Sequence, residues 1–294
     1  MHIPVLKKEV LGYLDPKENE NFVDCTVGHG GHAKAILERT SPAGKVLGID
    51  SDLKQIKICQ SQLKEFKERI ILVSSSYTKI KKIVKKNNFQ PINGILLDLG
   101  MSSWHLENSG RGFSFLKDEP LDMRYNNDNN LTAEEIVNSW GQKEIETILK
   151  EYGEERSAKE ISQKIIEERK RKPIKTTFQL AEIIEKAVPL KFQHKRINFA
   201  TRTFQALRIA VNGELNNLKK VLPQTVDVLK ESGRIAIISF HSLEDKIVKS
   251  FLKEKVKEGE LKILTKKPIA PSFEEIKTNP RSRSAKLRAA IKIK

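Results

Sequence analysis

The sequence predicts an open α/β sheet that is interrupted by a long helical insertion. An extended apolar run at 21–25 leads through a glycine-rich turn into a helix-like segment, an order typical of parallel sheets that bind nucleotides. Apolar runs of strand length then recur, which predicts further strands at 46–49, 70–74, 92–99 and 234–240. Between the last two runs, helical spacing extends from Thr132 to about Val211, and this predicts the insertion.

The elements before the insertion alternate between helix and strand. Asp15-Pro16 ends a short helical lead-in, and Asp50-Ser51-Asp52 supplies an N-cap for the helix after the second strand. For the lysine-rich helix at 79–86 we favour a solvated face. In chain order the sequence predicts a lead-in helix within 1–19, a strand at 21–25, a helix at 32–40, a strand at 46–49, a helix from 53 to about 66, a strand at 70–74, a helix at 79–86 and a strand at 92–99.

The turn after the first strand has three interpretations. The segment Gly28–Ala33 fits the dinucleotide pattern G-x-G-x-x-G/A, which favours a nicotinamide enzyme. Asp24 at the base of the turn would repel a pyrophosphate but suits a ligand with a cationic amino-acid end. S-adenosylmethionine (SAM) is such a ligand, because it has no phosphate and carries a sulfonium and a methionine tail. A purely structural turn between strand and helix is the third interpretation.

Polar residues end the strands that follow. Asp50 ends the second strand, roughly twenty residues past the glycines, where a carboxylate accepts hydrogen bonds from ribose hydroxyls. Tyr77 follows the third strand, and its ring suits either contact with an adenine or packing at the rim. Asp98 ends the fourth strand. Because the carboxyl ends of parallel strands meet at one edge, we expect Gly30, Asp50 and Asp98 to face the same crevice.

The insertion begins with a polar segment. Residues 102–130 are rich in Gly, Ser, Asn and Asp, and loops of this length are usually functional. A capping box at Thr132–Glu135 then opens the helical part, with helices predicted at 143–152, 154–171, 176–187 and 199–211. We therefore predict a discontinuous sheet domain at 1–104 and 213–294, and a helical insertion at 105–212.

Basic residues gather in two parts of the chain. In the insertion the basic residues are Arg169–Lys172, Lys175, Lys191, His194, Lys195, Arg196 and Arg202. Phe192 and Phe199 lie among them in the sequence, and their rings suit either base stacking or the core of small helices. The tail from Lys277 to Lys294 carries seven Lys or Arg residues and no acid. Within it, Arg281 and Arg283 are candidate phosphate contacts.

Sheet character returns after a helix predicted at 214–231. The strand at 234–240 is nearly all apolar and leads to His241, which has three interpretations: a base, a base-stacking ring, or a helix N-terminal residue with no chemistry. A helix at 242–256 and a strand at 261–265 follow. The alternation at 287–293 predicts an antiparallel last strand.

Composition bounds the class of protein. The 294 residues carry 54 Lys and Arg against 38 Asp and Glu, a net charge of +16. This excess favours a nucleic-acid partner over a merely solvated lysine-rich surface. The two cysteines, Cys25 and Cys59, lie far apart and form no metal-binding pattern. Without a signal peptide or an apolar run long enough to span a membrane, we expect a reduced, cytoplasmic protein.

Several motifs follow one another along nearly the whole chain: His2–Leu6, Asp24–His32, Asp98–Ser103, Arg111–Phe115, Leu121–Arg124, Thr201–Ile209, Ser239–Asp245 and Asn279–Arg288. In this order they resemble one family, the bacterial small-subunit ribosomal RNA cytosine-N4 methyltransferases, called RsmH or MraW. The resemblance implies a Rossmann-like class I SAM-dependent methyltransferase sheet with an inserted all-helical substrate domain. It also implies methylation of the N4 exocyclic amine of one cytidine in the decoding region of 16S rRNA, within the small ribosomal subunit.

The resemblance also assigns residues. The family's contacts to the cofactor SAM carry over to Gly30, Gly31, His32, Asp50, Tyr77, Asp98 and His105. The family more often has Phe where this chain has Tyr77, and Ser-Ser-Pro-Gln where it has Ser103-Trp104-His105. A histidine still donates a hydrogen bond there, but the loop loses the fixed φ of proline.

The substrate side is a hypothesis. The cytosine amine is a poor nucleophile, so the site needs acceptors that let its nitrogen pyramidalise, and Asp122 and His241 are our candidates. Arg111 and Arg124 are candidates for phosphate or base contacts. We expect no metal site and a monomer or homodimer. Two other classes of protein stay open here. A nicotinamide oxidoreductase would leave the net charge of +16 unexplained. A non-catalytic rRNA-binding assembly factor would leave unexplained the crevice expected at the carboxyl ends of the strands.

Overall fold

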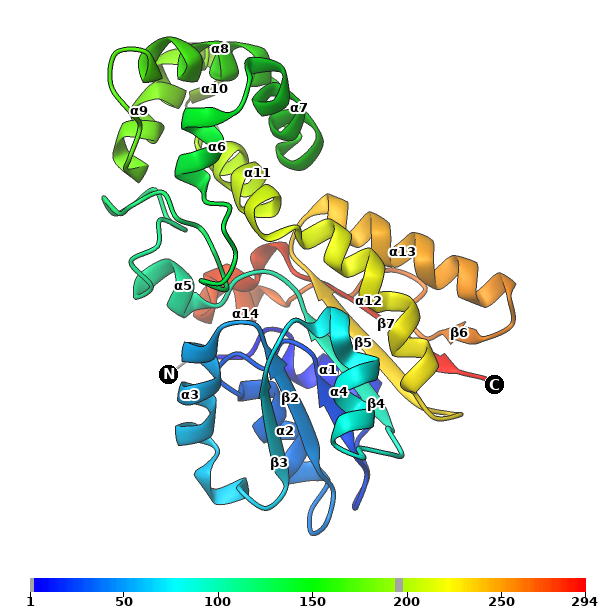
Figure 1. Ribbon diagram of the computed structural model, residues 1–294. Helices are drawn as coiled ribbons and strands as arrows, with labels where there is room; N and C mark the ends of the chain where they lie inside the picture. The colour runs from blue at the N-terminus through cyan, green and yellow to red at the C-terminus, as the bar shows by residue number, and fades with distance from the viewer. Residues whose placement is uncertain (1–2, 194–197) are drawn as a thin grey trace. The chain divides into compact units, whose positions relative to one another are not determined.

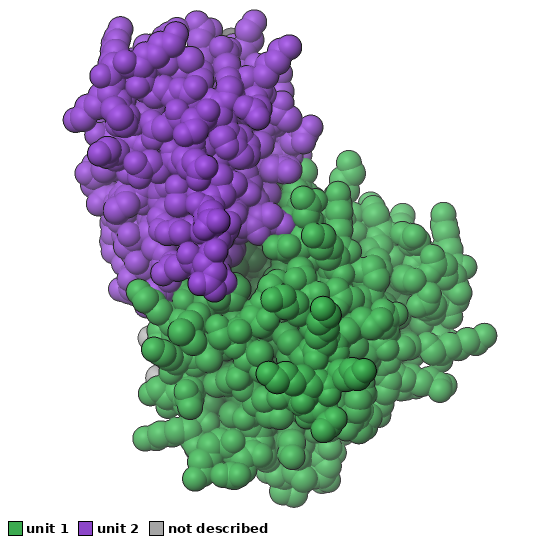
Figure 2. All heavy atoms as spheres, in the orientation of Figure 1, with its two compact units in different colours: residues 1–100, 215–294 green, residues 101–214 purple. Residues whose placement is uncertain are grey.

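The computed structural model describes residues 3–193 and 198–294 (Figure 1). The chain divides into two compact units, one of residues 1–100 and 215–294 and the other of residues 101–214 (Figure 2). These divisions lie close to the predicted boundaries at 104/105 and 212/213. The predicted basic residues His194, Lys195 and Arg196 lie outside the described residues. Among the described residues, none of the helices combines the length and apolar character needed to cross a bilayer.

A seven-stranded sheet organises the first unit. Its strand order is β3-β2-β1-β4-β5-β7-β6, with β1 to β5 parallel and β7 antiparallel to both of its neighbours. The strands are β1 (Phe22–Asp24), β2 (Val46–Asp50), β3 (Ile70–Ser74), β4 (Gly94–Asp98), β5 (Arg234–Ser239), β6 (Leu261–Ile263) and β7 (Lys286–Lys292). The predicted α/β class and the antiparallel last strand are confirmed.

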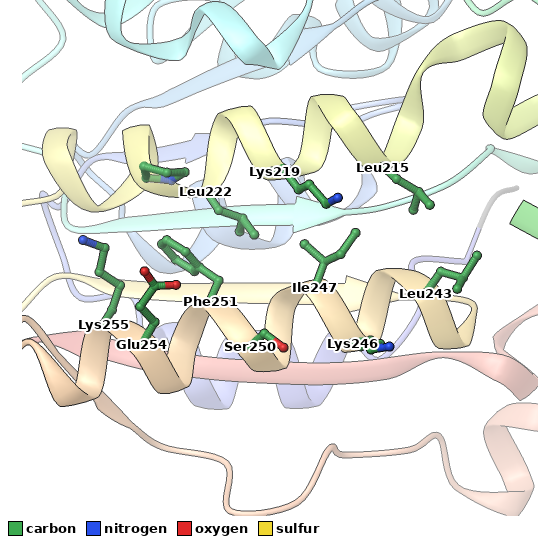
Figure 3. Close-up of a pocket in the computed structure, with 11 residues that line it drawn as sticks. Leu215, Lys219, Leu222, Leu243, Lys246, Ile247, Ser250, Phe251, Glu254 and Lys255 are labelled. Carbon is green, nitrogen blue, oxygen red and sulfur yellow. The ribbon is translucent and has the colours of Figure 1, made fainter. Parts of the chain in front are cut away.

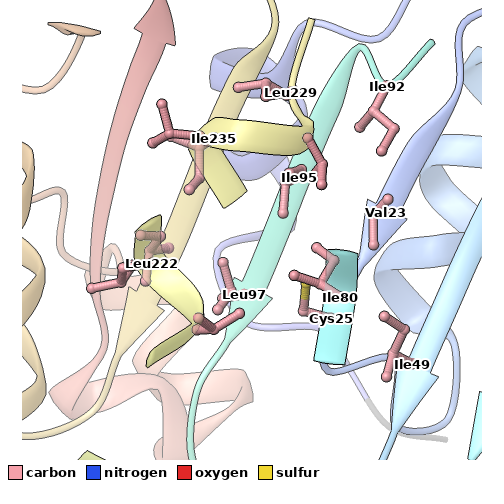
Figure 4. Packing of buried hydrophobic residues seen from close by; sticks show 14 of the residues in the cluster. Val23, Cys25, Ile49, Ile80, Ile92, Ile95, Leu97, Leu222, Leu229 and Ile235 are labelled. Atoms are coloured by element: carbon pink, nitrogen blue, oxygen red, sulfur yellow. The ribbon is translucent and has the colours of Figure 1, made fainter. Parts of the chain in front are cut away.

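Helices cover both faces of this sheet. They are α1 (Lys7–Leu14), α2 (Gly31–Arg39), α3 (Leu53–Gln62), α4 (Ile80–Lys86), α12 (Glu214–Val228), α13 (Ser242–Lys257) and α14 (Phe273–Thr278). Short 3₁₀ turns occur at η1 (Lys64–Phe66), η2 (Tyr77–Lys79) and η3 (Pro280–Ser284). One core lies under α4, α12 and α13 (Figure 4), and the other lies under α1, α2 and α3.

Alternate residues of each strand enter the two cores. In β4, Ile95 and Leu97 pack in the first core while Leu96 packs in the second. In β5, Ile237 packs in the first core and Ile238 in the second. Because side chains alternate across a pleated sheet, a strand covered on both faces reads as a continuous apolar run. This explains why the central strands lack polar alternation in the sequence.

The second unit is helical. Its helices are α5 (Ser103–Glu107), α6 (Ala133–Ser139), α7 (Gln142–Gly153), α8 (Ala158–Arg169), α9 (Thr177–Ala187), α10 (Leu190–Gln193) and α11 (Thr201–Asn212). The predicted cap at the start of α6 is present, since Thr132 accepts a hydrogen bond from Glu135 N. The helix predicted at 154–171 begins later, at Ala158, because Glu154 has a positive φ of 49° and ends α7. Phe199 packs against the core of this unit.

Candidate functional site

The glycine turn between β1 and α2 is held by Asp50. The Gly28 N–H donates to one oxygen of this carboxylate at 3.0 Å, and the Asp52 N–H donates to the other at 2.9 Å. The carboxylate therefore fixes the turn to the start of α3.

Gly30 and Gly31 are required by the backbone and by packing. Gly30 has a φ of 86° and precedes the first residue of α2. A Cβ on Gly30 would lie 2.7 Å from Leu63 Cδ1 and 2.8 Å from Cys59 Sγ, and one on Gly31 would lie 2.5 Å from Pro4 Cγ. Side chains at these positions would displace the turn, so the glycines let the N-terminus of α2 approach the edge of the sheet.

Carboxyl groups line the same edge. Thr26 links the Asp24 carboxyl to the backbone of Asp98, because its N–H donates to Asp24 Oδ1 at 3.1 Å and its hydroxyl accepts from the Asp98 N–H at 2.7 Å. Burial, reinforced by the charge of Asp50, raises the pKa of Asp24 to about 7. Burial and the charges of Asp24 and Glu244 raise the pKa of Asp98 as well. The edge therefore favours a cationic ligand, which would relieve this repulsion.

Two further predicted cofactor residues lie in this unit. His32 is buried in the first turn of α2, with Nε2 3.7 Å from Asp98 Oδ2. Tyr77 begins η2 and packs, half-buried, against the core beneath α4. The rim-packing interpretation of Tyr77 therefore holds, and its contact with an adenine stays a prediction.

His241 is the N-cap of α13. Its Nδ1 accepts from Glu244 N at 3.4 Å, and its Nε2 lies 3.3 Å from Glu244 Oε1. Glu244 is buried and also accepts from Phe240 N at 2.9 Å. Of the three interpretations, the helix N-terminal position is confirmed, while a chemical role stays a prediction. Sequence reasoning missed Glu244, although the spacing His241-x-x-Glu244 is that of a capping box.

In the second unit, Asp122 and Arg124 form a bidentate ion pair. Arg124 donates Nε to Oδ1 at 2.7 Å and Nη2 to Oδ2 at 2.8 Å. Partial burial opposes ionisation of Asp122, but the hydrogen bonds from Arg124 outweigh it and hold the pKa below the ordinary value. Asp122 is therefore suited to accept a hydrogen bond and poorly suited to act as a strong base at neutral pH.

Arg111 is buried, with 7% of its surface exposed. Its Nη1 donates to the carbonyl oxygens of Arg124 at 2.8 Å and Tyr125 at 3.0 Å, and the guanidinium lies over the Trp104 ring. It therefore holds the segment that bears Asp122 and Arg124. Its proposed contact with RNA stays a prediction, as does that of Arg124.

His105 lies in α5 among aromatic rings. Its ring centroid is 5.1 Å from those of both Phe113 and Tyr125, and its Nδ1 accepts from Ser102 N at 3.2 Å. The remaining predicted RNA residues, Arg281 and Arg283, lie exposed on η3 of the first unit. The structure thus places the predicted cofactor residues other than His105 in the first unit.

A family model described as the MraW methylase family matches residues 1–293. The chain belongs to this family. Three relatives carry the name "Ribosomal RNA small subunit methyltransferase H". Those of Clostridium botulinum (strain Kyoto / Type A2) and Kosmotoga olearia are 46% and 49% identical and align over 99% of this chain, and over 99% and 97% of their own. That of Thermotoga neapolitana is 46% identical, over 98% of this chain and 95% of its own.

The residues of this methylase fit SAM. The carboxyl groups of Asp24, Asp50 and Asp98 suit a ligand that carries a sulfonium and an ammonium, and they would repel a pyrophosphate. The positive φ of Gly30 sets the tight turn that leads into the N-terminus of α2. Among the three interpretations of the glycine turn, SAM is therefore the one that agrees with both the family and the chemistry of the edge.

A separate groove lies between α12 and α13 in the same unit (Figure 3). Its volume is about 630 Å³, and its walls combine apolar side chains with lysines at the rim: Leu215, Lys219, Leu222, Pro223, Leu243, Lys246, Ile247, Ser250, Phe251, Glu254 and Lys255. None of the predicted site residues lines it. The groove is therefore distinct from the carboxyl-lined edge that fits the cofactor.

Proposed function

We propose that this methylase transfers a methyl group from SAM to the N4 exocyclic amine of one cytidine in the decoding region of 16S rRNA. The observation that carries the proposal is the carboxyl-lined edge beside the glycine turn, in a chain that matches the MraW methylase family over its whole length. The names of the relatives support small-subunit rRNA as the substrate. The net charge of +16 agrees with a polyanionic partner.

The proposed cofactor site is formed by Gly30, Gly31, His32, Asp50, Tyr77, Asp98 and His105. When bound, SAM supplies a methyl group made electrophilic by its positively charged sulfur. Asp50, at the carboxyl end of β2, would accept hydrogen bonds from the ribose hydroxyls. Asp24 and Asp98 would stabilise positive charge at the edge, and their repulsion is relieved when a cation binds.

The proposed substrate contacts come from Asp122 and His241. Asp122, ionised and held by Arg124, would accept a hydrogen bond from the target amine and orient its lone pair. His241 is the second candidate for the substrate side; to act as a base it would have to release the Glu244 N–H that its Nδ1 accepts. Arg124, Arg281 and Arg283 are proposed for RNA contacts, while the buried Arg111 would hold the segment that bears Arg124. The expected state is a cytoplasmic monomer or homodimer.

The test is tritium transfer from labelled SAM to small ribosomal subunits isolated from cells that lack this enzyme. Nucleoside analysis of the labelled rRNA is expected to show N4-methylcytidine at a single position. Label on another nucleoside, or on free RNA only, would contradict the proposed substrate while leaving the methylase activity intact. Binding of the subunit without any transfer would instead support a non-catalytic assembly factor.

A further inference from the structure

Phe273 is an aromatic ring held out into solvent. It is the first residue of α14, and 82% of its surface is exposed, the highest value among the large apolar side chains of the described residues. Single exposed apolar residues are common on proteins, so exposure alone assigns no function. What distinguishes Phe273 is the rigidity of the backbone beneath it and the charge of the side chains around it.

The backbone beneath Phe273 is tied to two other parts of the unit. Glu275 of the same helix accepts from Leu6 N at 2.7 Å, and Asn279 donates to Ile3 O at 3.2 Å. Ahead of the helix, Ile269 exchanges both backbone hydrogen bonds with Leu287 of β7, at 2.9 and 2.8 Å. The ring is therefore presented by a fixed support, which lowers the entropy lost when a partner binds.

Cations occur on α14 and on the neighbouring turn η3. Lys277 lies one turn after Phe273 on the same side of α14 and is exposed. Arg281 and Arg283 are exposed on η3, which packs against α14 and is held by the buried Ser282. The two acids of the helix, Glu274 and Glu275, offset part of this charge, but the three cations outnumber them. The local charge is therefore positive.

We infer that Phe273, Lys277, Arg281 and Arg283 form a platform on which an unpaired base of the RNA substrate stacks. An exposed ring among cations suits single-stranded RNA, because the ring stacks on the base while the cations contact the adjacent phosphates. A protein partner would be expected to need a larger apolar patch than one ring. This inference rests on the proposed function. It adds to that function an aromatic residue that stacks on a base of the RNA whatever the identity of the base.

The test compares four variants of the full chain for methylation of small ribosomal subunits. Phe273→Ala is expected to raise KM for the subunit about tenfold, within the range of about 1–3 kcal/mol measured for stacking of one base, and to leave kcat unchanged. Phe273→Tyr keeps a ring and is expected to retain the wild-type KM. Phe273→Leu keeps apolar area without a ring and is expected to behave as Phe273→Ala.

Phe178→Ala provides the matched control, because Phe178 is a partly exposed phenylalanine in the other unit, at 46% exposure. It is expected to leave KM unchanged. Equal KM for Phe273→Ala and wild type would overturn the platform. Full rescue by Phe273→Leu would also overturn it, since an apolar contact with a protein would then explain the effect.

A binding measurement separates this inference from the proposed function. Phe273→Trp is mixed with a single-stranded RNA oligonucleotide, and stacking is expected to quench tryptophan emission beyond the change seen for wild type. Quenching without methylation of subunits by the wild-type enzyme would overturn the proposed substrate alone. Methylation with neither quenching nor a change of KM in Phe273→Ala would overturn the platform alone.

Discussion

Burial decides the ionisation of Asp24. The pKa of this carboxyl rises from 3.8 to about 7, so the folded protein binds more protons than the unfolded chain between these two values. The stability of the ligand-free protein is therefore expected to fall as the pH rises from about 4 to about 7. Above pH 7 the whole cost of burying the ionised Asp24 is present, and stability falls no further from this group. A cationic ligand reverses this penalty, which couples SAM binding to pH.

We predict that SAM raises the melting temperature more at pH 8 than at pH 6. The reason is that Asp24 carries its charge only at the higher pH, where the cation relieves the cost of burying it. Thermal denaturation with and without SAM measures the effect. Asp24→Asn is expected to be more stable than wild type at pH 8 without SAM and to reduce the pH dependence. A pH dependence equal to that of wild type in this variant would exclude Asp24 as its source.

Asp50→Ala removes the acceptor that holds Gly28 and, in the proposed complex, the ribose. We expect SAM affinity to fall by about 1–3 kcal/mol, the cost of leaving buried polar groups unpaired. Titration calorimetry measures this directly. An affinity equal to that of wild type would show that Asp50 serves the turn and not the ligand.

Asp122→Asn tests the substrate side. The amide keeps one acceptor but loses the charge and the bidentate pair with Arg124, so methyl transfer is expected to fall strongly. SAM affinity is expected to stay near that of wild type. Arg124→Lys serves as the companion variant, because it keeps the carboxylate while breaking the bidentate geometry. Loss of SAM binding in Asp122→Asn would reassign Asp122 to the cofactor or to folding.

At the scale of elements, the junction of β1 with α2 depends on backbone conformation. Gly30 has a positive φ, and a Cβ there would lie within 3 Å of both Leu63 and Cys59. The strand, the turn and the helix are each predictable from sequence because their signals are local. The neighbours that enclose Gly30 come from α3 and the residue that follows it, and only the fold brings them there.

Gly30→Ala is expected to destabilise the protein by about 2 kcal/mol or more, from the positive φ and the overlap with its neighbours. SAM affinity should fall with it, because the turn must shift. Gly12→Ala is the matched control: Gly12 lies in α1, and a Cβ there meets nothing within 4 Å. That variant is expected to gain about 0.5–1 kcal/mol, as alanine favours a helix. Urea denaturation distinguishes the two, and an equal effect of both would refute the argument.

At the scale of the whole molecule, the excess of cations governs association with RNA. The net charge is +16, and phosphate contacts make binding depend on salt. Replacing both Arg281 and Arg283 by Ala is expected to weaken RNA binding and to reduce the slope of log affinity against log salt by about 1–2. The control, Lys64→Ala with Lys67→Ala, removes the same charge from exposed residues near η1. Equal slopes for both double variants would indicate a diffuse charge effect and not a contact.

The sequence also predicted the order of strands and helices along the chain and the edge that carries the carboxyl groups. These features follow from local signals, namely apolar periodicity, a glycine turn and polar residues where strands end. The resemblance to a family added the cofactor and the substrate. Helix ends were less predictable, as the late start of α8 after Glu154 shows, because a positive φ outside glycine has no strong local signal.

Tertiary structure decided what the local signals left open. It placed β7 between β5 and β6, and it buried Arg111, a candidate phosphate or base contact, as a donor to backbone carbonyls. Burial in the folded chain also raised the pKa of Asp24. The physical reason is the same in each case: strand pairing, burial and ion pairing depend on which groups the folded chain brings together, whereas turns and amphipathic periods depend on neighbours along it.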